Sequence, residues 1–318
     1  MGSNAMTRII FFGTPEPAAK ALRALVKDGH EVGAVFTRPD RISGRSRKPR
    51  PTSVNEAAVE LGLPVHTPSG LHGDDVRNQL TATPADIYVV LAYGRILPTA
   101  ILALPALGVL NVHPSLLPLY RGPSPVVTAI RDGASETGVS VMLLDEGMDT
   151  GPVIGQSAAV PITESDTAES LTEQLFTMGV DLLVKTIPAW ERGDIEGVSQ
   201  DDALATVTSL IEKSDGELDF GKPALNIARA IRAYHPWPGT FTRWNGKLLK
   251  ILEASVFGMG ANFRPGVVSI DGGRLIIGTG HGSLDVKRVQ LEGRGVVFAE
   301  EFLRGYPAIE GASLPDPD

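Results

Sequence analysis

The sequence predicts an α/β protein, with a doubly wound, mostly parallel sheet in its N-terminal domain and a small C-terminal β-barrel domain. Two observations carry this prediction. Over residues 6–190, short apolar runs alternate with amphipathic helical patterns, which is typical of parallel strands connected by helices. Over residues 215–314, short β patterns follow one another between turn residues, which indicates a small barrel. The polar stretch 191–214 is the expected linker, and residues 1–5 resemble an expression-tag remnant.

The N-terminal domain begins with a strand and a helix. The run 8–12 is short and apolar, as in a buried strand. Apolar residues then recur at helical spacing, as at Leu22 and Leu25, so we expect a helix over 16–27. Further strands are expected at 32–37, 63–66, 86–92, 108–112, 139–144 and 153–160, and further helices at 52–61 and 167–190. Several of these strands are almost wholly apolar, as parallel strands covered on both faces are.

The C-terminal domain is predicted to hold one helix and five strands. The helix is expected at 223–234, and the strands at 239–244, 248–256, 266–270, 275–278 and 284–289. Turn residues such as Asp271-Gly272-Gly273 separate them.

Composition restricts the compartment and the partners. The chain has no cysteine, which excludes disulfides and thiolate sites and fits a reducing, cytoplasmic setting. No apolar run approaches the roughly 20 residues that a membrane helix needs. The net charge of −8 argues against a polyanionic partner, but two segments are basic. Residues 1–50 contain ten Lys and Arg against four Asp and Glu, and residues 222–252 contain six Lys and Arg and no acid.

Three polar residues form a candidate catalytic group. Asn111 and His113 are two residues apart, so an extended segment directs both side chains to one face. They stand at the carboxyl end of the strand expected at 108–112, where ligands of open α/β sheets bind. Asp149 comes from a second, turn-rich loop. The amide can donate to an oxyanion, the imidazole can move protons near neutral pH, and the carboxylate can fix the imidazole tautomer or share the proton.

This group suits an acyl-type transfer with no metal and no covalent intermediate, and other sites fit less well. A calcium loop starting at Asp145 is disfavoured because Gln156 stands where a bidentate Glu is needed. Ser115 lacks the Gly-x-Ser-x-Gly context of a nucleophile. The segment after the first strand lacks Gly-x-Gly-x-x-Gly, which disfavours a nicotinamide dehydrogenase.

Over nearly its whole length the chain resembles the folate-dependent formyltransferases. The resemblance rests on Phe12-Gly13-Thr14-Pro15, Asn111-x-His113-x-Ser115-Leu116-Leu117-Pro118, Arg121-Gly122, Asp145-x-Gly147-x-Asp149-Thr150-Gly151 and Pro236-Trp237-Pro238. It implies formyl transfer from 10-formyltetrahydrofolate to an amine and an OB-like C-terminal barrel. Asn111 would stabilise the oxyanion, His113 would donate to the same oxygen or relay a proton, and Asp149 would pair with His113.

The resemblance also implies a folate pocket. In the family the pterin lies between the loop after a central strand and the loop before the catalytic Asp, and a Ser-Leu-Leu-Pro turn shapes the pocket. The matching residues here are Arg95, Ile96, Leu97, Ser115, Leu116, Leu117, Pro118, Glu146 and Gly147.

The basic segment 37–51 bears on the acceptor, with six cations and one anion in 15 residues. The resemblance is greatest to family members that act on initiator methionyl-tRNA, in which a matching loop enters near the acceptor stem and Arg45 takes the place of a key arginine. We expect tRNA contacts from Arg38, Arg41, Arg45, Arg47, Lys48, Arg50, Arg229, Arg232, Arg243, Lys247 and Lys250.

Three alternatives remain at the sequence level. The basic segment could be an ordinary solvated loop, the acceptor could be an amino sugar nucleotide, or the chain could be a non-catalytic RNA-binding relative. Formyltransferases of nucleotide sugars lack such a basic loop, and the intact catalytic group argues against a non-catalytic protein. The chain departs from the family in its linker, where Val207-Thr208-Ser209-Leu210 replaces a Tyr-Ala-x-Lys-like stretch. A monomer without membrane contact is expected.

Overall fold

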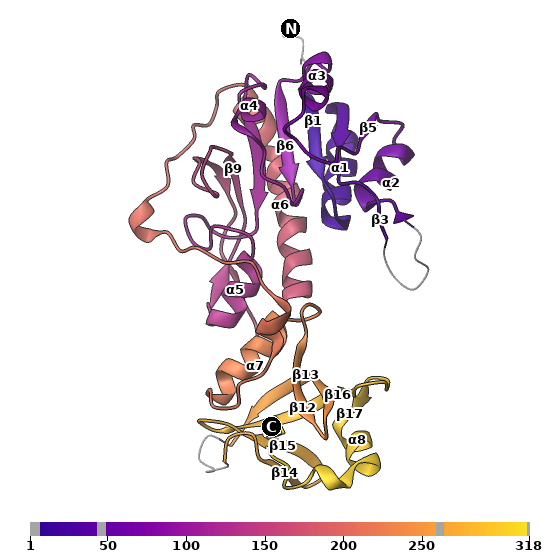
Figure 1. Cartoon of the computed structure of the whole chain (residues 1–318). Coiled ribbons are helices and arrows are strands. Elements are labelled where there is room, and N and C mark those ends of the chain that lie inside the picture. The colour runs from indigo at the N-terminus through magenta and orange to yellow at the C-terminus, as the bar shows by residue number, and fades with distance from the viewer. Residues whose placement is uncertain (1–6, 43–48, 259–263, 317–318) are drawn as a thin grey trace. The chain divides into compact units, whose positions relative to one another are not determined.

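The structure, a computed structural model, describes residues 7–42, 49–258 and 264–316 (Figure 1). The chain divides into two compact units. The first unit comprises Met1–Gly122, Thr137–Val160 and Glu173–Val207. The second unit comprises Pro123–Glu136, Pro161–Thr172 and Thr208–Asp318. The domain boundaries expected near residues 190 and 215 stay a prediction about which segments fold independently.

A seven-stranded sheet forms the centre of the first unit, in the order β10-β9-β7-β6-β1-β2-β5. The strands are β1 (Arg8–Gly13), β2 (Glu31–Phe36), β5 (Val65–His66), β6 (Ile87–Leu91), β7 (Val109–His113), β9 (Ser140–Leu143) and β10 (Val153–Gln156). The five strands from β7 to β5 are parallel, while β9 is antiparallel to both β7 and β10. Every residue of β6 is buried, as its apolar sequence predicts.

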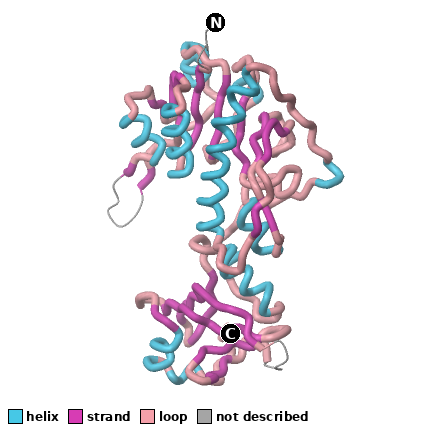
Figure 2. Tube along the Cα trace, turned by 180° about the vertical axis from the view of Figure 1, so that it is seen from behind, coloured by secondary structure: helices cyan, strands magenta, loops and turns pink. Residues whose placement is uncertain are grey.

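Helices cover both faces of this sheet. They are α1 (Glu16–Lys27), α2 (Ser53–Glu60), α3 (Asp74–Ala82), α4 (Thr99–Leu102) and the long α6 (Ala168–Glu191), which crosses the sheet in Figure 2. On one face Val76 of α3 and Ile101 of α4 join the core around Phe12. On the other face α6 packs so closely that a Cβ on Gly179 would lie 2.5 Å from the side chain of Val112. This is the doubly wound arrangement predicted from the sequence.

The second unit contains a six-stranded, wholly antiparallel sheet. Its path runs β12-β13-β16-β15-β14, and β17 pairs with β16. The strands are β12 (Thr240–Trp244), β13 (Lys247–Phe257), β14 (Val268–Asp271), β15 (Arg274–Gly278), β16 (Ser283–Leu291) and β17 (Val297–Phe298). The helices of this unit are α5 (Pro125–Asp132), α7 (Ala224–Ala233) and α8 (Ala299–Gly305). The predicted fold class is therefore confirmed.

Some short elements differ from the sequence expectation. The single strand expected at 153–160 is two strands, β10 and β11 (Val160–Pro161), because the hydroxyl of Ser157 accepts from Val139 N and donates to Ala158 O where the chain turns. The two-residue strands β3 (Arg41–Ile42), β4 (Pro49–Arg50) and β8 (Glu136–Thr137) were not predicted either. Within the described ranges, no helix has both the length and the apolar character for a membrane crossing.

Candidate active site

Asn111 and His113 lie within β7, at its carboxyl end, so the strand ends at His113 and not at residue 112 as the sequence suggested. The strand continues to His113 because Ser140 of β9 pairs with it. Val112 between them faces α6, so both polar side chains point to the opposite face of the sheet, as predicted from their spacing. His113 is buried and Asn111 is partly exposed, which leaves the amide accessible to a ligand.

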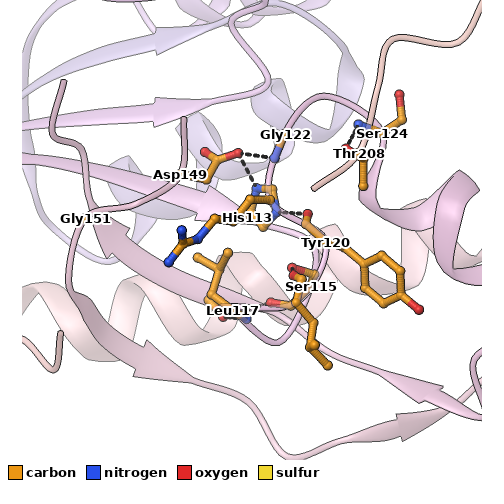
Figure 3. Close-up of polar contacts among 12 residues, drawn as sticks. His113, Ser115, Leu117, Tyr120, Gly122, Ser124, Asp149, Gly151 and Thr208 are labelled. Atoms are coloured by element: carbon orange, nitrogen blue, oxygen red, sulfur yellow. Dashed lines mark hydrogen bonds and ion pairs between the residues drawn. The ribbon is translucent and has the colours of Figure 1, made fainter. Parts of the chain in front are cut away.

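His113 is held by two groups from different loops (Figure 3). Its Nε2 lies 2.9 Å from the backbone carbonyl of Tyr120, and its Nδ1 lies 3.6 Å from Oδ2 of Asp149. A carbonyl oxygen only accepts hydrogen bonds, so Nε2 carries a proton. Nδ1 is the ring nitrogen that faces the Asp149 carboxylate. The Tyr120 carbonyl therefore fixes the tautomer, which is one of the two roles anticipated for Asp149.

The loop 145–151 has an unusual backbone that places the Asp149 carboxylate. Asp149 adopts a left-handed conformation with φ of 55°, and its Oδ2 accepts a hydrogen bond of 2.7 Å from Gly122 N. Asp145 closes the loop, since its Oδ1 accepts from Gly147 N at 3.0 Å and from the Thr150 hydroxyl at 2.7 Å. The Asp-x-Gly-x-Asp-Thr-Gly pattern thus codes for a hydrogen-bonded loop that presents one carboxylate.

Gly151→Ala is expected to displace this loop. A Cβ at Gly151 would lie 1.9 Å from the carbonyl oxygen of Leu143, a backbone atom that cannot move aside cheaply. We expect a loss of about 1–3 kcal/mol in unfolding free energy, together with at least a tenfold fall in kcat, measured by thermal unfolding and turnover. Gly70→Ala is the matched control, because a Cβ there meets nothing within 4 Å. Equal behaviour of the two variants would contradict the steric argument.

The Ser-Leu-Leu-Pro turn is fixed from the neighbouring strands. The Ser140 hydroxyl donates to Ser115 O at 2.8 Å and accepts from Leu117 N at 3.0 Å. The Gln156 amide donates to Leu117 O and to the Ser140 hydroxyl, both at 3.0 Å. Ser115 itself is buried and donates to Leu119 O, which is the role of a turn residue and not of a nucleophile. Sequence reasoning missed Ser140 and Gln156, since nothing distinguishes them from other polar strand residues.

The remaining residues expected at the folate pocket differ in exposure. Ile96 is 85% exposed, and Glu146 and Gly147 are exposed on the loop before Asp149. Leu97 is buried in the core, and Arg95 donates from Nη1 to Pro68 O at 2.7 Å, so both also anchor their loop. The loop 92–98 follows β6, which pairs in parallel with β7, so it leaves the sheet beside Asn111 and His113.

The N-terminal basic residues lie in different places. Arg45, Arg47 and Lys48 lie outside the described residues. Arg41 and Arg50 pair across the short strands β3 and β4, and Arg50 is exposed. Arg38 lies against the loop after β6 instead, because a Cβ on Gly94 would come within 3.3 Å of its Nη1.

The C-terminal cations divide into two sets. Arg232 donates to the carbonyls of Thr163 at 3.1 Å and Asp166 at 2.7 Å, and burial lowers the pKa of its guanidinium. Arg229 fills the space beside Gly133, where a Cβ would lie 2.1 Å from its Cζ. These two guanidinium groups therefore pack within the second unit.

The other set lies on the β12–β13 hairpin, where Arg243 and Lys247 are exposed and Lys250 is partly exposed. Arg243 pairs with Leu248, so Arg243 and Lys250 share one face of the hairpin. The two tryptophans near them differ. Trp244 is buried and contacts Phe302 and Tyr306 edge-on, whereas Trp237 is 57% exposed.

The comparison with known proteins supplies the family. A model described as "Formyl transferase" matches residues 7–187, and a model described as "Formyl transferase, C-terminal domain" matches residues 210–307. The chain belongs to the formyl transferase family. The methionyl-tRNA formyltransferase of Chloroflexus aurantiacus is 44% identical over 303 residues, covering 95% of this chain and 97% of that protein. The one from a Roseiflexus species is 44% identical over 311 residues, covering 97% and 95%.

Two solved structures of lower sequence identity share the fold. An N-formyltransferase from Helicobacter canadensis, in complex with folinic acid and dTDP-3-aminofucose, has a TM-score of 0.67 at 20% identity and covers 88% of this chain and 99% of that one. HypX from Aquifex aeolicus, in complex with tetrahydrofolic acid, has a TM-score of 0.64 at 17% identity over 94% of this chain and 47% of that one. In the part of the chain that the structure describes, no group of three or more His, Asp or Glu side chains could hold a metal ion.

Proposed function

We propose that this protein transfers a formyl group from 10-formyltetrahydrofolate to the α-amino group of methionine on initiator methionyl-tRNA. The observation that carries the proposal is the 44% identity to methionyl-tRNA formyltransferases over 95% of the chain, through both matched domains. The site geometry supports it, because an accessible amide lies two residues from a histidine that faces a carboxylate.

The three residues divide the reaction between them. As the amine nitrogen bonds to the formyl carbon, negative charge develops on the formyl oxygen, and the Asn111 amide donates to it. The amine then loses one proton toward Nδ1 of His113, where Asp149 lies 3.6 Å away and offsets the positive charge. When the bond from the carbon to N10 of the folate breaks, one proton is returned to N10. No metal takes part in this sequence.

We place the folate beside the loop 92–98 and the loop 145–151. Ile96, 85% exposed, and Met148, 55% exposed, offer apolar surface suited to a flat heteroaromatic ring. Glu146 and Gly147, which directly precede Met148, are also exposed. They supply a carboxylate and backbone groups for polar contacts. The buried part of the Ser115–Pro118 turn acts by shape, since Ser140 and Gln156 hold it in place.

The acceptor proposal rests on exposed cations for which no partner is found among residues 7–42, 49–258 and 264–316. Arg50 is exposed in the first unit, and Arg243 and Lys247 are exposed in the second. Cations of this kind position a tRNA through its phosphates without reading its sequence. The contributions of Arg45, Arg47 and Lys48 rest on the sequence alone. A cytoplasmic location and a monomeric state remain part of the proposal.

A single assay tests the function. Formyl transfer from 10-formyltetrahydrofolate is measured with methionyl-tRNA, free methionine and an amino sugar nucleotide as acceptors. We expect turnover with methionyl-tRNA and none with the other two. Turnover with only the sugar nucleotide, or the absence of turnover with all three acceptors, would overturn the proposal.

Arg243→Ala and Arg232→Ala should separate phosphate contact from packing. Arg243 is exposed, so its loss is expected to weaken tRNA binding and to reduce the slope of log K against log salt concentration by roughly 0.7–0.9. Arg232 bonds two backbone carbonyls, so its loss is expected to lower the unfolding free energy by about 1–3 kcal/mol and to leave the slope unchanged. Binding titrations at several salt concentrations and thermal unfolding check both. An unchanged salt slope in Arg243→Ala, with a reduced slope in Arg232→Ala, would remove Arg243 from the proposed tRNA surface.

A further inference from the structure

Residues 198–206, which we name the strap, are ordered and hydrogen-bonded along the catalytic face, although the sequence suggested a linker there. At one end Val198 exchanges backbone hydrogen bonds of 2.8 and 2.9 Å with Val153 of β10. At the other end Thr206 accepts from Arg121 N at 2.8 Å through its carbonyl and from Tyr120 N at 2.7 Å through its hydroxyl. The strap therefore connects β10 to the loop that follows His113.

Gln200 lies in the strap, and both the nitrogen and the oxygen of its side-chain amide form hydrogen bonds. Its Nε2 donates to the carbonyls of Asp149 at 2.8 Å and Gly151 at 2.7 Å. Its Oε1 accepts from Nε of Arg121 at 2.9 Å, and Arg121 is buried with its Nη2 2.8 Å from Asp202. Gln200 thus joins the loop that carries Asp149 to the loop that carries Arg121.

Both loops determine the relation between His113 and Asp149. The residue before Arg121 is Tyr120, whose carbonyl holds Nε2 of His113, and the residue after it is Gly122, whose N–H holds the Asp149 carboxylate. Gln200 therefore contacts the backbone of Asp149 on one side, and on the other side Arg121, the residue between Tyr120 and Gly122. Its bonds also oppose relaxation of the left-handed backbone at Asp149.

We propose that Gln200 is a positioning residue for formyl transfer, which fixes the Asp149 carboxylate against Nδ1 of His113. This inference deepens the proposed function and rests on it. The position requires two N–H donors and one acceptor without charge. A glutamate would direct a carboxylate at two carbonyl oxygens, and a methionine would fill the same space without any of the three hydrogen bonds.

The test compares Gln200→Met and Gln200→Glu with the wild-type chain under saturating methionyl-tRNA and 10-formyltetrahydrofolate. We expect kcat to fall by about 10- to 100-fold, because small displacements of a reacting group cost that much, while both KM values change less than about threefold. Leu204→Ala is the matched control, since this strap residue is 62% exposed and should keep wild-type kcat. A Gln200 variant that keeps wild-type kcat, or a Leu204 variant that loses it equally, overturns the proposal.

A double-mutant cycle separates positioning from general damage to the fold. If Gln200 acts through Asp149, Gln200→Met should cost less than about threefold in an Asp149→Asn background, because residues acting as one unit are not additive. If the fold losses in kcat of the two single variants instead multiply in the double variant, Gln200 has a structural role only and the inference is wrong. Failure of the wild-type chain to formylate methionyl-tRNA would instead count against the proposed function, so the two failures are distinguishable.

Discussion

His113→Ala is expected to reduce kcat for formylation of methionyl-tRNA by about 10²- to 10⁴-fold, the usual contribution of a positioned acid–base group. The imidazole is buried, its Nε2 bonds to the Tyr120 carbonyl, and its Nδ1 faces the Asp149 carboxylate. Binding of tRNA should stay near the wild-type level, because His113 is buried and is not one of the exposed cations proposed to contact phosphates. Single-turnover kinetics and a tRNA titration measure both quantities.

Two further variants control this result. Asp149→Asn keeps an oxygen that can accept from Gly122 N and removes only the charge facing Nδ1, so it should also lower kcat by orders of magnitude. His72→Ala, at an exposed position, should leave kcat unchanged. Near wild-type turnover in His113→Ala would remove the imidazole from the mechanism, and the same result for Asp149→Asn would remove the carboxylate.

Asn111→Ala is expected to reduce kcat by about 10²- to 10³-fold, the cost of losing one oxyanion donor. Among the described residues the Asn111 amide has no hydrogen-bond partner, so its removal leaves no protein group unsatisfied. The unfolding temperature should therefore stay close to that of the wild-type chain, which distinguishes this variant from His113→Ala. In His113→Ala the Tyr120 carbonyl loses its hydrogen-bond donor, which is expected to lower the unfolding temperature.

Asn111→Asp provides the sharper comparison for the oxyanion role. It preserves the shape of the side chain but removes the N–H donor and adds negative charge where the oxyanion forms, so it should be at least as slow as Asn111→Ala. Asn226→Ala, at an exposed position of α7, is the control for generic effects. A faster Asn111→Asp than Asn111→Ala would exclude the oxyanion role.

The main elements of the fold could be predicted because their apolar residues are periodic. α1 (Glu16–Lys27) begins and ends at the predicted residues, since it buries five side chains at helical spacing. α3 and α8 were missed because they bury only two and three side chains, too few to establish a period.

The three candidate catalytic residues could be selected from the sequence, but the groups that hold them in place could not. The partners of His113 and Asp149 include a carbonyl at Tyr120 and an N–H at Gly122, and no residue type signals a backbone contact. Gln200 lay in a polar stretch with no periodic pattern, which resembles a linker whether or not it packs. Charge density likewise could not show that the guanidinium of Arg232 binds its own chain.

The linker departure can now be described residue by residue. Val207 is 72% exposed and Leu210 is 75% exposed, so apolar side chains stand where the family commonly carries a tyrosine and a lysine. Thr208 is buried, and its hydroxyl accepts from Ser124 N at 3.1 Å within the second unit. Position 210 offers no ammonium group, so the proposed tRNA contacts rest on other cations.

The histidine of this site is oriented by a peptide group, and that restricts which changes can disturb it. Every residue that can adopt the left-handed backbone of Tyr120 offers the same carbonyl oxygen, so exchange of Tyr120 for asparagine or glycine is expected to leave the tautomer of His113 as it is. The loop between them is sensitive to length instead, because Tyr120 adopts a φ of 58° to turn its backbone. One residue inserted or deleted between positions 114 and 120 is expected to displace this carbonyl from Nε2 of His113.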